Sequence, residues 1–140
     1  MKVSSTPLMQ EFQLETDPDG VAMVLVRQAR EGENIERAKM FARTRYGQDG
    51  DDTYAEQEVN ARLLRRKEAY LTLGRATGFL DENEKELFRS KETKEGASVR
   101  AAMSESDFNA AWDRLLPETA VEIGRHVFEV NITWNPNPGE

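Results

Sequence analysis

Polar and apolar residues alternate near the start of the chain. The segment Glu11-Phe12-Gln13-Leu14-Glu15 has this alternation, which is typical of a half-buried strand. An apolar run over residues 21–26 follows, and the turn signal Asp17-Pro18-Asp19-Gly20 lies between the two. The pattern predicts a β-hairpin, preceded by a loose arm over residues 1–9.

Further along the chain, apolar residues recur at helical spacing. We expect a helix from an N-cap at Asn34 to about residue 45, with Ile35, Ala38, Phe41 and Ala42 on one face. An acidic loop over 47–52 separates it from a second helix over 53–67. That helix gives way to a strand within 70–80, a shorter strand is expected over 86–89, and 90–101 is expected to be an irregular loop.

The last third of the chain predicts a helical hairpin. Ser104 is suited to cap a helix over 104–115, and Pro117 is suited to the first position of a helix over 117–130. The apolar stripe of the first helix contains Phe108, Ala111, Trp112 and Leu115, and that of the second contains Ala120, Ile123, Val127 and Val130. A tail rich in proline and asparagine follows over 132–140.

Strand patterns early and helix patterns later predict one α+β domain over residues 1–140. We expect a small antiparallel sheet, extended by strands within 70–80 and 86–89, packed with about four helices.

The composition and charge of the chain argue against several classes of function. The formal net charge of −7 argues against nucleic acid and against an anionic membrane surface as partners. The chain has no cysteine and one histidine, and it lacks phosphate-loop, nucleophile-elbow and zinc-helix motifs. We therefore expect no enzyme activity, no metal and no cofactor. The first residues lack a signal-peptide pattern, which indicates a cytoplasmic protein.

Two acidic segments are compared with the calcium-binding loop of an EF-hand. Started at Asp49, an EF-hand loop would have Tyr54 and Asn60 where glycine and glutamate belong. Started at Asp81, it would keep the glutamate as Glu92, lack the glycine and place Lys85 at a ligand position. Both segments are expected to be solvated turns.

A basic cluster marks the second helix. Arg62, Arg65, Arg66 and Lys67 lie close together at helical spacing. Two interpretations stay open: a site for an acidic partner surface, or a solvated face paired within the chain to Glu58 or Glu68.

The C-terminal aromatic residues are candidates for partner binding. Phe108 and Trp112 fit the core, whereas Phe128 lies one position off its stripe and Trp134 lies beyond the last helix. Trp134 either folds back over the core or remains an exposed anchor for a partner. His126, one helical turn from Glu122, is interpreted as an ordinary surface or half-buried histidine.

Three stretches together resemble tail assembly chaperones of long-tailed bacteriophages. The resemblance covers about residues 10–135. Its segments are the hairpin ending in Val24-Leu25-Val26-Arg27-Gln28-Ala29 with the charged helix after Glu31-Gly32-Glu33-Asn34; Phe79-Leu80-Asp81-Glu82-Asn83 leading to Leu87-Phe88; and Met103-Ser104-Glu105-Ser106-Asp107-Phe108 with Ala111-Trp112-Asp113-Arg114-Leu115-Leu116-Pro117-Glu118 and Glu129-Val130-Asn131.

The resemblance implies a non-catalytic protein in the host bacterial cytoplasm that binds the tape measure protein and helps to recruit tail tube subunits. From the basic cluster and the C-terminal aromatic residues, the candidate partner-binding residues are Phe128, Trp134, Arg62, Arg65 and Arg66, and self-association into a homo-oligomer stays open. Two alternatives remain: a small structural protein of the tail or head–tail neck, and an acidic regulatory or inhibitory protein.

Overall fold

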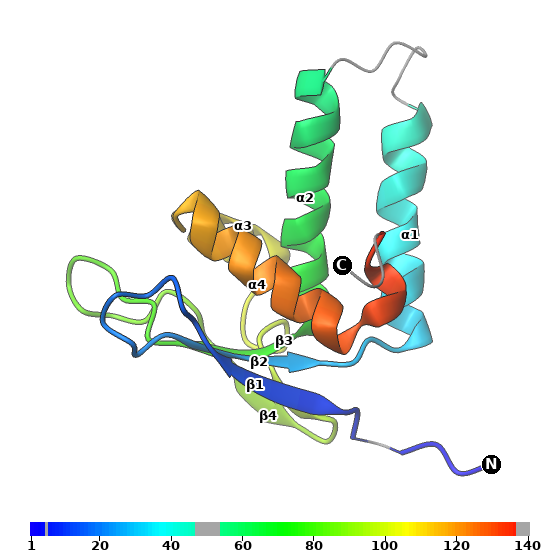
Figure 1. Ribbon diagram of the computed structural model, residues 1–140. Helices are drawn as coiled ribbons and strands as arrows, with labels where there is room; N and C mark the ends of the chain where they lie inside the picture. The colour runs from blue at the N-terminus through cyan, green and yellow to red at the C-terminus, as the bar shows by residue number, and fades with distance from the viewer. Residues whose placement is uncertain (5, 47–53, 137–140) are drawn as a thin grey trace.

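Figure 1 shows the computed structural model, which describes residues 1–4, 6–46 and 54–136. An antiparallel sheet has the strand order β1-β2-β3, formed by β1 (Met9–Gln13), β2 (Met23–Arg27) and β3 (Leu73–Thr77). A second, two-stranded sheet pairs β4 (Lys91–Thr93) with β5 (Gly96–Ser98). With the helices, these sheets form the predicted α+β fold.

The predicted hairpin is confirmed, with its first strand beginning earlier than expected. Its turn is held by the Asp17 carboxylate, which accepts the backbone N–H groups of Asp19, Val21 and Ala22. Gly20 adopts a φ of 68°, a conformation that glycine reaches without steric cost. These bonds lower the pKa of Asp17, the Ala22 N–H contributing most.

Four α-helices accompany the strands in the described part of the chain. They are α1 (Glu31–Tyr46), α2 (Tyr54–Thr72), α3 (Glu105–Trp112) and α4 (Pro117–Val130), and a short 3-10 helix, η1, covers Ile132–Trp134. Figure 1 shows α1 and α2 side by side and antiparallel, rising away from the sheet. Helix α4 lies between the sheet and α2 and contacts both.

The prediction for α1 is wrong in two respects. The helix begins before Asn34, because the Glu33 carboxylate accepts the Arg30 N–H in the manner of a capping box. The predicted apolar face is not buried, because Ile35, Ala38 and Phe41 are all exposed. The side chain of Ala42, the fourth residue of that face, is outside the part of the chain that the structure describes. Polar residues of α1 face the rest of the protein instead.

The helix-to-strand transition after residue 67 is confirmed, because α2 ends at Thr72 and β3 begins at Leu73. The predicted strand over 86–89 is wrong. Only an isolated bridge joins Leu80 to Glu86, and Phe88 turns inward to meet the Phe79 ring edge-on. The predicted loop over 90–101 contains β4 and β5. Their sequences, KET and GAS, lack the alternation of apolar and polar residues that would have predicted strands. The predicted acidic loop over 47–52 lies outside the described residues.

The helical hairpin of α3 and α4 is confirmed together with its caps. Ser104 Oγ accepts the Asp107 N–H at 3.1 Å, and Pro117 is the first residue of α4. Both predicted stripes face the core. Phe108 is completely buried, with its ring 5.9 Å from that of Trp112, and both residues belong to the core as expected.

Candidate functional site

The predicted basic cluster lies where α2 meets the α3–α4 hairpin. Its side chains line two separate hollows beside α2. The first, which we call the arginine hollow, has a volume of about 230 Å³. Its lining residues are Arg62, Leu63, Arg65, Arg66, Trp112, Asp113, Leu115, Pro117 and Ala120.

Arg65 is the least satisfied cation of the arginine hollow. It is half-buried, and it forms no hydrogen bond or ion pair within the described part of the chain, although the Glu68 carboxylate attracts its charge. Burial lowers the pKa of its guanidinium, the neighbouring charge of Arg62 lowers it further, and the Glu68 carboxylate partly opposes this. The Arg65 stem lies directly over Gly124 of α4, where a β-carbon would lie 2.9 Å from its Cγ and Cδ. Glycine at this position therefore allows the close approach.

The other two arginines are paired within the chain. Arg62 donates to Glu58 at 2.8 Å and Arg66 donates to Asp113 at 2.9 Å. The carboxylate side chains are 65% and 57% exposed, respectively, so both pairs compete with water and contribute little to stability. Pairing of Arg62 with Glu58 and the attraction between Arg65 and Glu68 follow the solvated-face interpretation. Arg65 forms no direct ion pair among the described residues, so the acidic-partner interpretation stays open.

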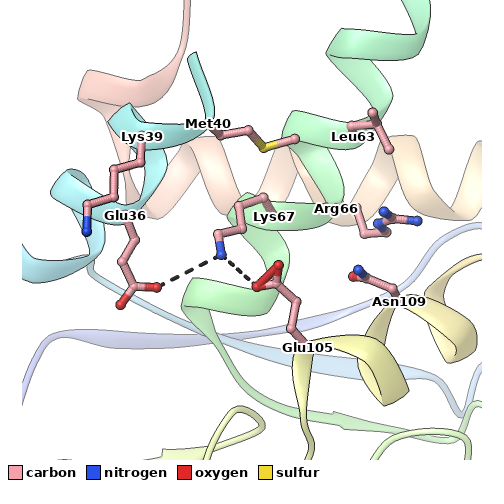
Figure 2. A pocket seen from close by; sticks show the side chains of 8 residues that line it. All are labelled: Glu36, Lys39, Met40, Leu63, Arg66, Lys67, Glu105 and Asn109. Atoms are coloured by element: carbon pink, nitrogen blue, oxygen red, sulfur yellow. Dashed lines mark hydrogen bonds and ion pairs between the residues drawn. The ribbon is translucent and has the colours of Figure 1, made fainter. Parts of the chain in front are cut away.

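The second hollow, of about 190 Å³, lies between α1, α2 and α3 (Figure 2). Lys67 extends into it between two carboxylates, at 2.6 Å from Glu105 and 4.0 Å from Glu36. Arg100 also donates to Glu36 at 3.0 Å. Glu36 and Glu105 compensate the charges of Lys67 and Arg100, so these pairs stabilise the packing of the helices around the hollow.

Trp134 is buried, and the expectation that it is an exposed anchor is wrong. Only 5% of the residue is exposed, and its indole N–H donates to Asn34 Oδ1 at 2.8 Å. The Arg37 guanidinium lies 5.0 Å from the Trp134 ring centroid, within cation–π range. The alternative in which the tail folds back over the core is therefore correct. Phe128 is half-buried and packs against the core, and its contact with a partner stays a prediction.

Arg37 also forms an ion pair with a buried carboxylate of α2. Its Nε donates at 2.7 Å to Glu68, whose side chain is 3% exposed. Burial raises the pKa of Glu68, although its hydrogen bond and proximity to Arg37 partly oppose that rise. The pair joins α1 to α2.

Glu122 is an important polar residue that the sequence analysis did not assign. Its buried carboxylate accepts the N–H groups of Glu15 and Thr16, at 2.8 and 2.9 Å, and the Thr16 hydroxyl. His126 Nε2 lies 3.2 Å away, and the His126 ring stacks on Phe12. Burial alone would raise the pKa of Glu122, but the hydrogen bonds lower it to about 2.

The Glu122 network attaches α4 to the end of the hairpin and is structural in character. Its signal in the sequence was a carboxylate next to the apolar stripe of α4, but its backbone partners lie more than a hundred positions away. His126 is buried rather than at the surface.

The predicted acidic turn at Asp81 is confirmed as a turn. Its carboxylate accepts the N–H groups of Lys85 and Asn83, at 3.0 and 2.8 Å, which lowers its pKa. Within residues 1–4, 6–46 and 54–136, no group of three acidic or histidine side chains is placed to hold a metal ion.

Comparisons with known proteins found no similar protein: no family model matches the chain, and no curated protein and no solved structure matches it. Among the helices in the described ranges, none has the length and apolarity required to cross a membrane.

Proposed function

We propose that this chain is a non-catalytic tail assembly chaperone of a long-tailed bacteriophage. It acts in the host bacterial cytoplasm, where it binds the tape measure protein and helps to recruit tail tube subunits. The sequence resemblance suggests this role, and the character of the helical surface supports a protein-binding function.

The observation that carries the proposal is a set of large apolar side chains exposed on the two long helices. We call α1 together with residues 54–62 of α2 the helical arm (Figure 1). Ile35 and Phe41 on α1 are 52% and 47% exposed, and Tyr54 and Val59 on α2 are 92% and 53% exposed. Large apolar side chains on exposed helices are suited to docking another helix through apolar contacts.

The electrostatic character of the chain also suits this role. A net charge of −7 favours solubility of a complex that contains an aggregation-prone partner. The buried carboxylates of Glu68 and Glu122 are committed to an ion pair and to backbone amides. Groups held in this way support a binding scaffold better than a catalytic centre.

Capture of the tape measure protein tests the proposal. The affinity-tagged chain and the tape measure protein encoded in the same genome are co-expressed, and the retained protein is quantified. Capture that falls with Val59→Ser and Ile35→Ser, but not with Leu80→Ser, supports the helical arm as the binding surface. Leu80 is the matched control because it is an equally large apolar residue, 50% exposed and outside the arm.

Mass spectrometry of purified phage particles separates the chaperone from a structural tail protein. A chaperone is absent from the finished particle, whereas a tail or neck component is present in a fixed ratio to the tube protein. Presence in that ratio, or no capture by the wild-type chain, contradicts the proposal.

A further inference from the structure

We propose that the arginine hollow binds an acidic amphipathic helix of a partner protein, with a carboxylate on Arg65 and an apolar side chain on the floor beside it. The inference rests on the protein-binding function proposed above and assigns to it a second contact, centred on Arg65 rather than on the exposed apolar residues of the helical arm.

The first argument is the chemistry of the lining. Three guanidinium groups, from Arg62, Arg65 and Arg66, come together around one hollow whose single carboxylate belongs to Asp113. Trp112, Leu115, Pro117 and Ala120 supply apolar contact. This combination of cations and apolar contact is complementary to a ligand that presents carboxylates next to an aliphatic group.

The second argument is the state of Arg65. Its guanidinium has already lost part of its hydration through burial, and its charge is attracted to the buried Glu68 carboxylate without a direct hydrogen bond or ion pair between the two. A partially desolvated guanidinium whose N–H groups have no bonded carboxylate gains more from an incoming carboxylate than a fully hydrated surface cation does. Because its stem lies against Gly124 of α4, the guanidinium is also held in place before binding.

The third argument is size. A hollow of about 230 Å³ is smaller than most small-molecule and cofactor sites, which occupy roughly 300–1,000 Å³. It suits one or two side chains of a docked segment. A helix places side chains three and four positions apart on one face, so a carboxylate and a leucine of the same helix can enter together.

The pairs already formed by Arg62 and Arg66 are compatible with this occupant. Glu58 and Asp113 are mostly exposed, so exchange of either for a carboxylate of the partner costs little. Arg65 has no direct ion pair with a described residue that the partner would have to displace.

The test uses the full chain and a fluorescent synthetic helical peptide built of Glu, Leu and Ala. The control peptide carries Gln in place of every Glu. Fluorescence anisotropy should show binding of the acidic peptide that weakens as salt is added, and binding of the Gln peptide at least about tenfold weaker. Equal binding of both peptides, or binding that salt does not change, would overturn the proposal.

Variants locate the contact. Arg65→Gln is expected to weaken acidic-peptide binding by roughly tenfold or more, and Arg65→Lys by less, because lysine keeps the charge but loses the planar donor fork. Gly124→Ala is expected to weaken it as well, because the added methyl group displaces the Arg65 side chain. Arg75→Gln is the matched control: the residue is 46% exposed, is only loosely paired with Glu92 at 3.7 Å and lies on β3.

Circular dichroism and thermal melting verify that each variant is folded. Unchanged peptide binding in folded Arg65→Gln and Gly124→Ala contradicts the proposal. Sedimentation velocity tests a second copy as the occupant: concentration-dependent dimers that Arg65→Gln abolishes, without peptide binding, would also overturn it.

The two proposals fail separately. If the tape measure protein is captured equally by the wild-type chain and by Arg65→Gln, the arginine hollow is not its contact and the chaperone role survives. If the acidic peptide binds through Arg65 but the tape measure protein is not captured, the chaperone role fails and the acidic-helix site remains.

Discussion

The indole N–H of Trp134 donates a hydrogen bond of 2.8 Å to the side-chain oxygen of Asn34, across a hundred positions of sequence. This bond fixes the C-terminal 3-10 helix against the start of α1. Because α1 begins at Glu31, Asn34 lies inside the helix and not at its N-cap, and its side-chain oxygen accepts from Trp134 instead.

Trp134→Ala is expected to destabilise the protein by roughly 3–5 kcal/mol, because it removes a buried ring and leaves Asn34 without its donor. Chemical denaturation measures the loss. Ile132→Ala in the same 3-10 helix is the control, since Ile132 is 64% exposed and its truncation should cost little. A wild-type unfolding midpoint for Trp134→Ala would show that the tail does not pack as described.

Glu122 makes the free energy of unfolding depend on pH in the acid range. Its pKa is lowered from 4.5 to about 2 in the folded protein, so its contribution is present above about pH 4.5 and is lost as the pH falls toward 2. The contribution is on the order of 3 kcal/mol.

In Glu122→Gln this part of the pH dependence should disappear, and the variant should be less stable than wild type at neutral pH. Urea denaturation at a series of pH values measures both effects. Glu129→Gln is the control, because Glu129 is also close to His126 but its side chain is 48% exposed. Parallel pH profiles for wild type and Glu122→Gln would contradict the role of the Glu122 network.

Removal of Arg37 is expected to leave the buried Glu68 carboxylate without its cation. Arg37→Met should cost roughly 3 kcal/mol near neutral pH, and addition of Glu68→Met should restore part of the loss. Because the pKa of Glu68 is raised by burial, its protonation at lower pH should reduce the cost of Arg37→Met. Arg62→Met, which breaks only the exposed pair with Glu58, should cost less than about 1 kcal/mol.

Local patterns predicted the elements whose signals lie close together in the sequence. The Asp17–Gly20 turn, the Ser104 cap and Pro117 at the start of α4 each act within a few residues, and each was identified. The apolar stripes of α3 and α4 were likewise correct, because both helices bury one complete face.

The errors occur where distant contacts outweigh the local pattern. In α1 the residues facing the protein are Asn34 and Arg37, which bond to Trp134 and Glu68, so the apolar stripe remains exposed. The strands β4 and β5 contain few apolar residues, and β5 is held partly by its continuation, where the Val99 N–H donates to Leu73. The arginine hollow could not be predicted from the sequence, because it depends on how α4 packs against α2. The spacing of residues along one helix does not give the relative position of two helices.

The most direct test of the chaperone role is the solubility of the tape measure protein when it is produced with and without this chain. The soluble fraction is measured after centrifugation of lysates, with the wild-type chain, with Val59→Ser or with the matched control Leu80→Ser. We expect the wild type and Leu80→Ser to raise the soluble fraction clearly and Val59→Ser to raise it much less. A soluble fraction that does not change on addition of the wild-type chain would contradict the proposed function.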